Sequence, residues 1–308
     1  MSRTLVLVGA TATGKSAVAA RVAAARNLEV VSMDSMQVYR GIPVVTAQPE
    51  PELLAQAPHH LLEIADPAAH FDTAMYLDAC RAALDGIHAR GRAALLAGGT
   101  PMYYRSLVHG LSGLPGSEPA LRAQLIAEEE QGGPGTLHRK LAAVDGPSAA
   151  RLHPNDIRRL VRALEVHALS GRPQSALFAE PKHPLLVDFV AVGLAAPRAA
   201  LYARVDARVE RMWRAGLVDE IRGLRARLPP GRHTVQQAIG YPQIAGFLDG
   251  AHDEAEARRL VQRDTRRFAR RQILQFTAEP SVRWTAEDVF PNVDELAAAV
   301  TAVWDAQG

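Results

Sequence analysis

Eight residues near the N-terminus have the composition of a phosphate-binding loop. Residues 9–16 read Gly-Ala-Thr-Ala-Thr-Gly-Lys-Ser and match the P-loop spacing at every fixed position. Glycines let the main chain fold tightly around an anion, so that successive N–H groups point inward. The lysine adds a positive charge, and the serine hydroxyl is placed to hold Mg²⁺. We therefore predict that linked phosphates bind to Gly9, Ala10, Thr11, Ala12, Thr13, Gly14, Lys15 and Ser16.

Two further segments carry polar groups directly after apolar runs. Asp34 follows the run Glu29–Ser32, and Thr100 follows Ala93–Ala97 and two glycines. Because ligands of an open α/β sheet lie beyond the carboxyl ends of its strands, both side chains should face the phosphate loop. The Asp34 carboxylate is suited to bind Mg²⁺ or to accept a proton. Its alternative role is to be the N-cap of a helix that begins with Ser35.

A parallel sheet covered by helices would bring these groups together. Short apolar runs rich in β-branched residues are typical of buried parallel strands, and helical patterns follow them in the chain. We therefore predict an α/β fold with a P-loop NTPase-like core and a parallel sheet flanked by helices. The expected strands are Thr4–Val8, Glu29–Ser32, Ala93–Ala97 and Asp188–Gly193, and the expected helices include Ala17–Arg26 and Ala74–Ala89.

A stretch without strand signals interrupts this alternation. Three helical patterns, Ala120–Glu130, Leu137–Val144 and Asn155–Leu169, follow a linker-like segment that begins near Gly110. A run of helices between strands predicts an inserted all-helical subdomain over residues 113–173. Residues 1–112 and 174–308 would then form the core, the latter with an arginine-rich C-terminal helical region.

Residues 43–60 are rich in proline and polar residues, which predicts a long surface loop. The segment ends in His59 and His60, a pair that suggests metal binding. No cysteine or third histidine lies at ligand spacing, however, so a structural role is favoured.

Composition narrows the class of protein. The chain has 308 residues, of which 48% are hydrophobic and 22% charged, as in an ordinary globular enzyme. No apolar run approaches the ~20 residues that cross a membrane, and no signal peptide precedes the first strand. Cys80 is the only cysteine, which fits a reducing cytoplasm. We expect a monomer without membrane contact, since no extended apolar seam is visible.

Arginine is concentrated on two predicted helices. Only three of the 35 basic residues are lysines, and net charge is +2. The helix Ala199–Ala215 carries Arg204, Arg208 and Arg211 at spacings that place them close together. The helix Ala255–Phe276 carries seven arginines, with Asp264 as the only acid among them. Unpaired positive charge on this scale favours a polyanionic partner, although a solvated charged face is the usual alternative.

Several segments together resemble one family, the tRNA dimethylallyltransferases, also called tRNA isopentenyltransferases. The matches run in the family's order across nearly the whole chain. Besides the P-loop, they are Asp34–Arg40, Thr46–Pro49, Pro58–Leu61, Gly98–Thr100, Asp156–Val166, Ile239–Tyr241 and Thr265–Gln272.

The resemblance implies a reaction and roles for the catalytic groups. Members transfer a dimethylallyl group from dimethylallyl diphosphate to N6 of the adenosine 3′ to the tRNA anticodon. The P-loop would then bind a prenyl diphosphate instead of a nucleotide, with Lys15, Arg208 and Mg²⁺ on Ser16 stabilising the departing diphosphate. Arg204 is a close rival of Arg208. Asp34 would accept the N6 proton, and Thr100 would orient the amino group or the diphosphate.

The same resemblance implies a set of tRNA contacts. The target base must leave the anticodon stack, and arginine contacts to the RNA backbone would offset that cost. The implied tRNA-binding residues are Asp34, Ser35, Met36, Gln37, Thr100, Arg122, Arg158, Arg159, Leu160, Val161, Arg162, Gln237, Ala238, Ile239, Gly240, Tyr241, Pro242, Arg263, Arg267 and Arg270.

The chain departs from the family pattern at three places and leaves two other functions open. The departures are Pro101-Met102, Pro242-Gln243 and Leu274-Gln275, and they affect expected tRNA contacts but not the catalytic groups.

One alternative function is that of a P-loop small-molecule kinase that uses ATP and closes an arginine-bearing lid. The other is an RNA-binding protein that senses a nucleotide. Neither gives Asp34 a task.

Overall fold

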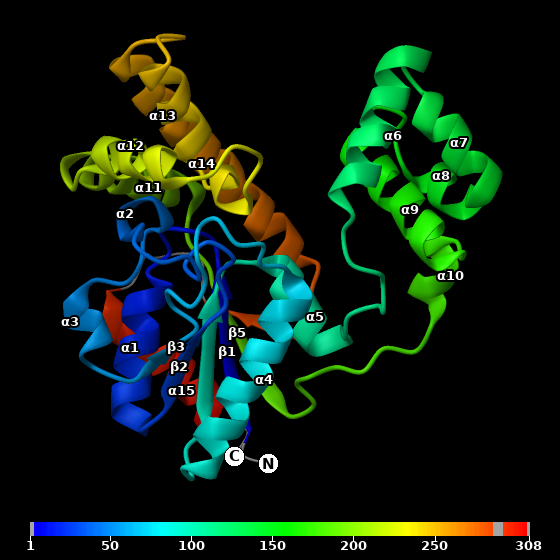
Figure 1. The fold of residues 1–308 in the computed structure, drawn as a ribbon. Helices are drawn as coiled ribbons and strands as arrows, with labels where there is room; N and C mark the ends of the chain where they lie inside the picture. Colours follow the sequence, from blue (N-terminus) through cyan, green and yellow to red (C-terminus); the bar gives the residue numbers. More distant parts are fainter. Residues whose placement is uncertain (1–2, 286–291, 307–308) are drawn as a thin grey trace. The chain divides into compact units, whose positions relative to one another are not determined.

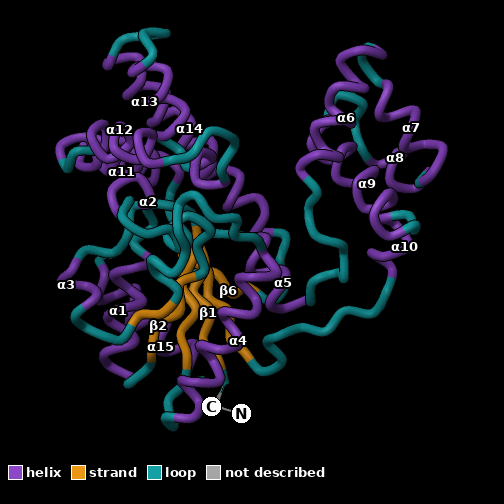
Figure 2. Tube along the Cα trace, in the orientation of Figure 1, coloured by secondary structure: helices purple, strands orange, loops and turns teal. Residues whose placement is uncertain are grey.

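A single parallel sheet forms the centre of the core. The computed structural model describes residues 3–285 and 292–306, and within them the strand order is β3-β2-β4-β1-β5-β6 (Figures 1 and 2). Every neighbouring pair is parallel, which confirms the predicted sheet. The strands are β1 Thr4–Gly9, β2 Glu29–Ser32, β3 His59–His60, β4 Ala94–Gly98, β5 Phe189–Leu194 and β6 Val282–Trp284.

Helices cover both faces of the sheet because β1 is apolar on both. Leu5 and Leu7 pack into one hydrophobic cluster, while Val6 and Val8 belong to another. The first cluster is closed by α1 and α15, and the second by α4, α5 and the end of α14, the helix Glu254–Thr277 (Figure 1). The covering helices are α1 Lys15–Arg26, α15 Val293–Asp305, α4 Thr73–Ala89 and α5 Pro101–His109.

A third cluster builds a group of helices over the carboxyl end of the sheet. Val38, Tyr39 and Ile42 follow β2 in the chain. Their side chains pack in one cluster with Ile221 and Ile244. The cluster thereby fixes these helices beside the loops that follow the strands (Figure 2). They are α2 Pro43–Thr46, α11 Arg198–Arg214, α12 Leu217–Arg227, the 3₁₀ helix η1 Thr234–Gln237 and α13 Tyr241–Leu248, and α14 Glu254–Thr277 packs against α11 and α13.

Residues 109–184 form a second compact unit, and residues 1–108 with 185–308 form the first. The second unit contains only helices, which pack around Leu125, Leu141, Leu160 and Leu164. The insert expected over 113–173 lies inside this range. Its helices are α6 Pro119–Gly132, α7 Thr136–Val144, α8 Gly146–Arg151, α9 Ile157–Ser170 and α10 Gln174–Ala179.

The second unit extends beyond the expected residues 113–173 at both ends. The reason is that the segment before its first helix contacts the segment after its last helix. A Cβ atom on Gly110 would lie 2.8 Å from Cβ of Lys182 and 2.9 Å from the main-chain nitrogen of His183. The φ angle of Gly110 is +80°, a region that favours glycine. The expected core also included residues 1–2, 286–291 and 307–308, which lie outside the described residues.

The prediction of a long loop over residues 43–60 is wrong. The segment contains α2, the short helix α3 Pro51–Leu54, and β3, which pairs with β2. The N–H groups of Val44 and Val45 donate to the Glu220 carboxylate at 2.9 and 2.6 Å. The partner that caps α2 thus lies far along the chain, where a local pattern cannot indicate it.

The paired histidines have structural contacts. His60 Nε2 lies 2.7 Å from Glu29 Oε2, and His59 Nδ1 lies 2.8 Å from the carbonyl of Ala57. In the described part of the chain no three His, Cys, Asp or Glu side chains are grouped as a metal site would require. Among those same residues, no helix has both the length and the apolar character needed to cross a membrane.

Candidate functional site

The strand order brings the predicted catalytic groups to one edge of the sheet. Strands β2, β4 and β1 are neighbours, so the loops that follow them lie side by side. The Ser35 N–H donates to Thr100 Oγ1 at 3.1 Å, and the Thr100 N–H donates to the carbonyl of Met33 at 3.4 Å. The loop that carries Asp34 therefore contacts the loop that carries Thr100, beside the P-loop that follows β1.

The P-loop turns tightly before helix α1 begins. Ala12 and Gly14 adopt left-handed conformations, with φ angles of 67° and 93°. Lys15 Nζ and Thr13 Oγ1 both donate to the carbonyl of Ala10, at 2.6 and 2.8 Å. Lys15 and Ser16 occupy the first turn of α1, where main-chain N–H groups lack helical partners and the helix dipole is positive. This geometry suits an anion.

Two N–H groups of the loop have acceptors within the protein. The Thr13 N–H donates to the carbonyl of Ala10 at 3.4 Å. The Thr11 N–H donates to Oε1 of Gln272 at 2.8 Å, so it does not point at the site of the anion. The Thr11 hydroxyl instead accepts a hydrogen bond from Arg208 Nη1 at 3.2 Å. The expectation that every residue of the loop offers its N–H to phosphate is thus wrong at Thr11, because a helix more than 250 residues later occupies that donor.

The two cations of the site, Lys15 and Arg208, are buried, and burial lowers the pKa of each. Burial and the neighbouring Arg208 guanidinium lower the pKa of Lys15 to about 7, although Asp34 opposes this shift. Burial likewise lowers the pKa of Arg208. A buried ammonium beside a guanidinium is costly without a compensating negative charge, which a bound diphosphate would provide.

A cavity of about 800 Å³ opens beside the P-loop. Arginines of α11 form one part of its wall, and α2 with the segment after it forms another. A Cβ atom on Gly14 would lie 3.7 Å from Arg204 Nη2, so Arg204 also approaches the loop, although it is more exposed than Arg208. The polar lining includes Lys15, Ser16, Gln48, Glu50, Arg204, Arg208 and Arg211.

Asp34 both caps a turn and faces the site. Its Oδ1 accepts the N–H groups of Met36 and Gln37 at 2.9 and 3.4 Å, so it caps a turn, whereas the predicted alternative was the cap of a helix, which does not form here. Its Oδ2 accepts no hydrogen bond from the described residues, and the side chain is half-buried. The charge of Asp34 acts on both Lys15 and Arg208. One oxygen therefore remains available for a proton while the other fixes the carboxylate.

Gln37 is held inside the protein instead of facing outward. Ser32 Oγ donates to Gln37 Oε1 at 3.1 Å, and Gln37 Nε2 donates to the carbonyl of Ala47 at 3.1 Å. Arg208 Nη2 donates to the same Ala47 carbonyl at 3.2 Å. Gln37 was expected to contact tRNA, but in the conformation seen here both groups of its amide are bound within the protein. The amide instead anchors the end of α2.

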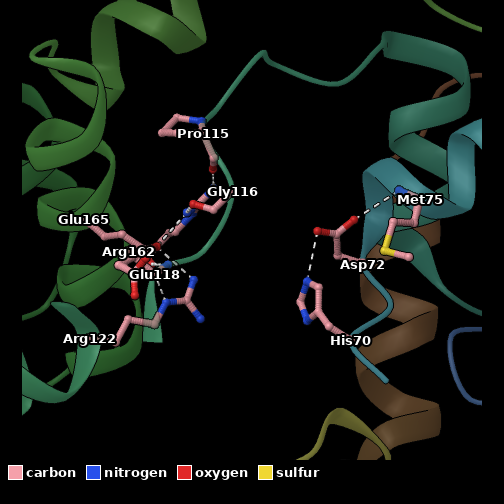
Figure 3. A network of polar contacts seen from close by, with 9 residues as sticks. All are labelled: His70, Asp72, Met75, Pro115, Gly116, Glu118, Arg122, Arg162 and Glu165. Atoms are coloured by element: carbon pink, nitrogen blue, oxygen red, sulfur yellow. Dashed lines mark hydrogen bonds and ion pairs between the residues drawn. The ribbon is translucent and has the colours of Figure 1, made fainter. Parts of the chain in front are cut away.

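Two of the arginines expected to contact tRNA bind a buried carboxylate in the helical unit. Arg122 donates to both oxygens of Glu165 at 2.7 and 2.8 Å, and Arg162 lies 2.6 Å from Glu165 Oε2 (Figure 3). Glu165 is 0% exposed, so these ion pairs help to hold the unit together. Leu160 and Val161 are buried in the same unit, and their side chains cannot contact RNA.

Other members of the expected tRNA-binding set divide by exposure. Arg158 is exposed, and Arg159 is exposed although it pairs with Asp156 at 3.2 Å. Around the start of α13, Gln237 and Pro242 are exposed and Ile239 is half-buried. Ala238, Gly240 and Tyr241 are buried there, so these three shape the turn and do not form its surface.

The expectation of unpaired arginines along α14 is mostly wrong. Besides Asp264, acidic partners come from α11 and from the start of α14, outside the segment that seemed to lack them. Arg270 is exposed and makes no hydrogen bond or ion pair with the described residues, and Arg271 lies 5.9 Å over the Phe268 ring. The pairs are Arg258 with Glu210 and Glu254, Arg259 with Glu256, Arg263 and Arg267 with Asp264, and Arg266 with Asp206.

The fold and this site define a P-loop α/β protein whose phosphate loop is joined by arginines of a separate helix and by a carboxylate. The sequence profile of the "IPP transferase" family matches residues 37–279, and that of "Isopentenyl transferase" matches residues 2–64. The chain belongs to this family, the tRNA dimethylallyltransferases.

Individual relatives agree along nearly the whole length. The tRNA dimethylallyltransferase of Symbiobacterium thermophilum is 46% identical over 285 residues, which cover 91% of this chain and 88% of that protein. The enzyme of the same name from Anaeromyxobacter sp. strain Fw109-5 is 43% identical over 307 residues. These residues cover 97% of this chain and 99% of that protein.

Solved structures give the same result. The full-length tRNA isopentenylpyrophosphate transferase of Bacillus halodurans superposes with a TM-score of 0.70 at 34% identity, covering 99% of this chain and 97% of its own. A eukaryotic dimethylallyltransferase acting on tRNA superposes with a TM-score of 0.81 at 26% identity, covering 100% of this chain and 80% of its own.

Proposed function

We propose that this chain transfers a dimethylallyl group from dimethylallyl diphosphate to N6 of the adenosine 3′-adjacent to the anticodon in tRNA and releases diphosphate. Family membership supports the reaction. The observation that carries it in this structure is the position of Asp34 and Thr100 beside Lys15 of the P-loop and Arg208 of α11. A site for diphosphate and a proton acceptor at one sheet edge are the two requirements of this chemistry.

The chemistry explains why the two must be close. An adenine N6 amino group is a weak nucleophile, so the allylic carbon must become strongly electrophilic as diphosphate leaves. The carbon–oxygen bond to diphosphate breaks, a bond from that carbon to N6 forms, and an N6 proton passes to Asp34. Lys15 and Arg208 would stabilise the negative charge that develops on the departing oxygen, and Thr100 would orient the amino group.

Mg²⁺ would bind at the Ser16 hydroxyl. Ser16 is partly exposed at the first turn of α1 and makes no side-chain hydrogen bond with the described residues. An oxygen donor on the protein, completed by diphosphate oxygens and water, is the ligand set that Mg²⁺ prefers. When bound, the ion would neutralise diphosphate charge; Lys15 and Arg208 hold the same anion from the protein side.

For tRNA, we propose contacts through those predicted residues that the structure leaves accessible. Extrusion of the target base costs a few kcal/mol, which contacts to the anticodon stem-loop would offset. Arg122 and Arg162 would act by holding the helical unit in shape, and Gln37 by holding α2. The accessible set is Ser35, Met36, Arg158, Arg159, Gln237, Ile239, Pro242, Arg263, Arg267 and Arg270. Because its substrate is tRNA, we expect the enzyme in the cytoplasm, acting as a monomer.

A transfer assay separates this function from its alternatives. Protein and Mg²⁺ are mixed with undermodified tRNA and labelled dimethylallyl diphosphate, without ATP. Transfer of label to tRNA is expected. ATP hydrolysis, or phosphorylation of a small molecule, with no label on tRNA would favour a P-loop kinase. Binding of tRNA without either reaction would favour an RNA-binding protein that senses a nucleotide.

A further inference from the structure

One buried side chain joins three elements of the site and has no role in the reaction described above. Gln272 lies on α14 and is 3% exposed. Its Oε1 accepts the Thr11 N–H of the P-loop at 2.8 Å, and its Nε2 donates to the carbonyl of Gly99 at 2.6 Å. A single carboxamide therefore connects the loop after β1 with the loop after β4.

The two partners fix which way the amide faces. An N–H group can only donate and a carbonyl can only accept, so Oε1 must face Thr11 and Nε2 must face Gly99. Neither a carboxylate nor an apolar side chain of similar size satisfies both. Loss of this amide would leave two buried main-chain groups without partners, which is costly.

The packing at Gly99 is built around the same amide. A Cβ atom on Gly99 would lie 2.3 Å from Gln272 Nε2 and 3.3 Å from the carbonyl of Gly9. Its neighbour Gly98 meets a different obstacle, because a Cβ there would lie 2.0 Å from the Met33 carbonyl oxygen. The absence of a side chain at Gly99 thus leaves room for the Gln272 side chain. The absence of a side chain at Gly98 leaves room for the main chain of the loop that carries Asp34.

We propose that Gln272 is a positioning residue for the transfer reaction. Its carboxamide holds the Gly99–Thr100 peptide at a fixed distance from the P-loop, and so sets Thr100 and the Asp34 loop against the bound diphosphate. This inference rests on the proposed function. Binding of either substrate alone does not require that alignment, but the reaction between them does, since small misplacement of reacting groups costs about 10²-fold in rate.

The first test separates turnover from binding. Gln272→Met keeps the size of the side chain and removes both hydrogen bonds. We expect kcat to fall about 10²-fold, with the KM for dimethylallyl diphosphate and the Kd for tRNA within about threefold of wild type. Gln275→Met, on the exposed face of the same helix, is the matched control and should keep the wild-type kcat.

A second test does not depend on the stability of one variant. Gly99→Ala should lower kcat in the wild-type background because its methyl group displaces Gln272. In a Gln272→Ala background the overlap with the amide is gone and only the 3.3 Å approach to the Gly9 carbonyl remains, so adding Gly99→Ala should lower kcat by less than about twofold further. Gly98→Ala should be damaging in both backgrounds, since its obstacle is main chain.

The outcomes are distinct. A kcat for Gln272→Met close to that of wild type would overturn the positioning role. So would a rise in KM and Kd by the same factor as the fall in kcat. So would equal effects of Gly99→Ala in the two backgrounds. Failure of the wild-type protein to transfer label would instead refute the proposed function itself.

Discussion

Single residues at the sheet edge divide into those that the sequence reveals and those that it does not. Asp34, Thr100 and Lys15 could be predicted because each follows a recognisable strand, and parallel strands end at a common edge. Gln272 could not, because its partners Thr11 and Gly99 come from strands far away in the chain. A polar residue on the buried side of a helix was the one available signal.

At the residue scale, the sharpest prediction concerns the proton acceptor. Asp34→Asn keeps the shape of the side chain, and its carbonyl oxygen can still cap the turn at Met36. Because the proton acceptor is lost, we expect turnover to fall about 10²- to 10⁴-fold while tRNA affinity stays within about threefold. Single-turnover transfer and equilibrium tRNA binding check this. A near-normal single-turnover rate would show that another group takes the N6 proton.

Lys15 should couple diphosphate binding to proton uptake. Its pKa is about 7 without ligand, and a bound diphosphate should raise it by pairing with the ammonium. Above pH 7, binding must therefore take up a proton, and affinity should fall by as much as tenfold per pH unit. Calorimetry in buffers of different ionisation enthalpy measures the uptake.

Lys15→Arg provides the control for that experiment, because a guanidinium stays charged throughout this pH range. Protonation of the diphosphate itself contributes equally to both proteins. The difference in proton uptake between them should approach one proton near pH 8. Equal uptake by the two proteins would mean that Lys15 is already charged in the free enzyme.

At the element scale, the helices show why charge patterns mislead. The arginines of α14 seemed unpaired because only Asp264 lies among them in sequence. The structure places α11 alongside, and its Asp206 and Glu210 neutralise Arg266 and Arg258. Likewise α8, α10 and the helices of residues 43–60 are too short for periodicity to predict, and distant partners such as Glu220 help to define them.

This pairing turns a general expectation about α14 into a specific one. Arg270→Ala should weaken tRNA binding and reduce the slope of log Kd against log salt by about one, because this exposed guanidinium pairs with no residue that the structure describes. Arg259→Ala removes an arginine already paired with Glu256 and is the matched control. Identical salt slopes for the two variants and wild type would show that the Arg270 face of α14 is only solvated surface.

At the scale of the whole molecule, the core and the helical unit are each tied together by one buried glutamate. In the helical unit Glu165 binds Arg122, Arg162 and the N–H of Glu118 at 2.7 Å. In the core, Glu29 of β2 binds Arg90 and Arg92 after α4 and His60 of β3. Each carboxylate joins segments that are distant in sequence.

Glu29 should make the core sensitive to acid. The hydrogen-bonded Arg90 guanidinium lowers the pKa of Glu29 to about 2, below that of an unfolded glutamate. A depressed pKa stabilises the folded state above the unfolded pKa, and this stabilisation is lost as pH falls through about 2. We expect Glu29→Gln to lower the free energy of unfolding by about 2 kcal/mol at pH 7.

Tryptophan fluorescence can isolate this effect, because Trp213, Trp284 and Trp304 all lie in the core unit and none in residues 109–184. Denaturant titrations of wild type and Glu29→Gln should differ most near neutral pH and converge as pH falls from about 4 towards 2. Glu256→Gln, which removes a surface carboxylate that pairs with Arg259, should change stability by less than about 0.5 kcal/mol at any pH. A Glu29→Gln deficit that stays constant with pH would mean that lost packing, and not the charge of Glu29, accounts for the difference.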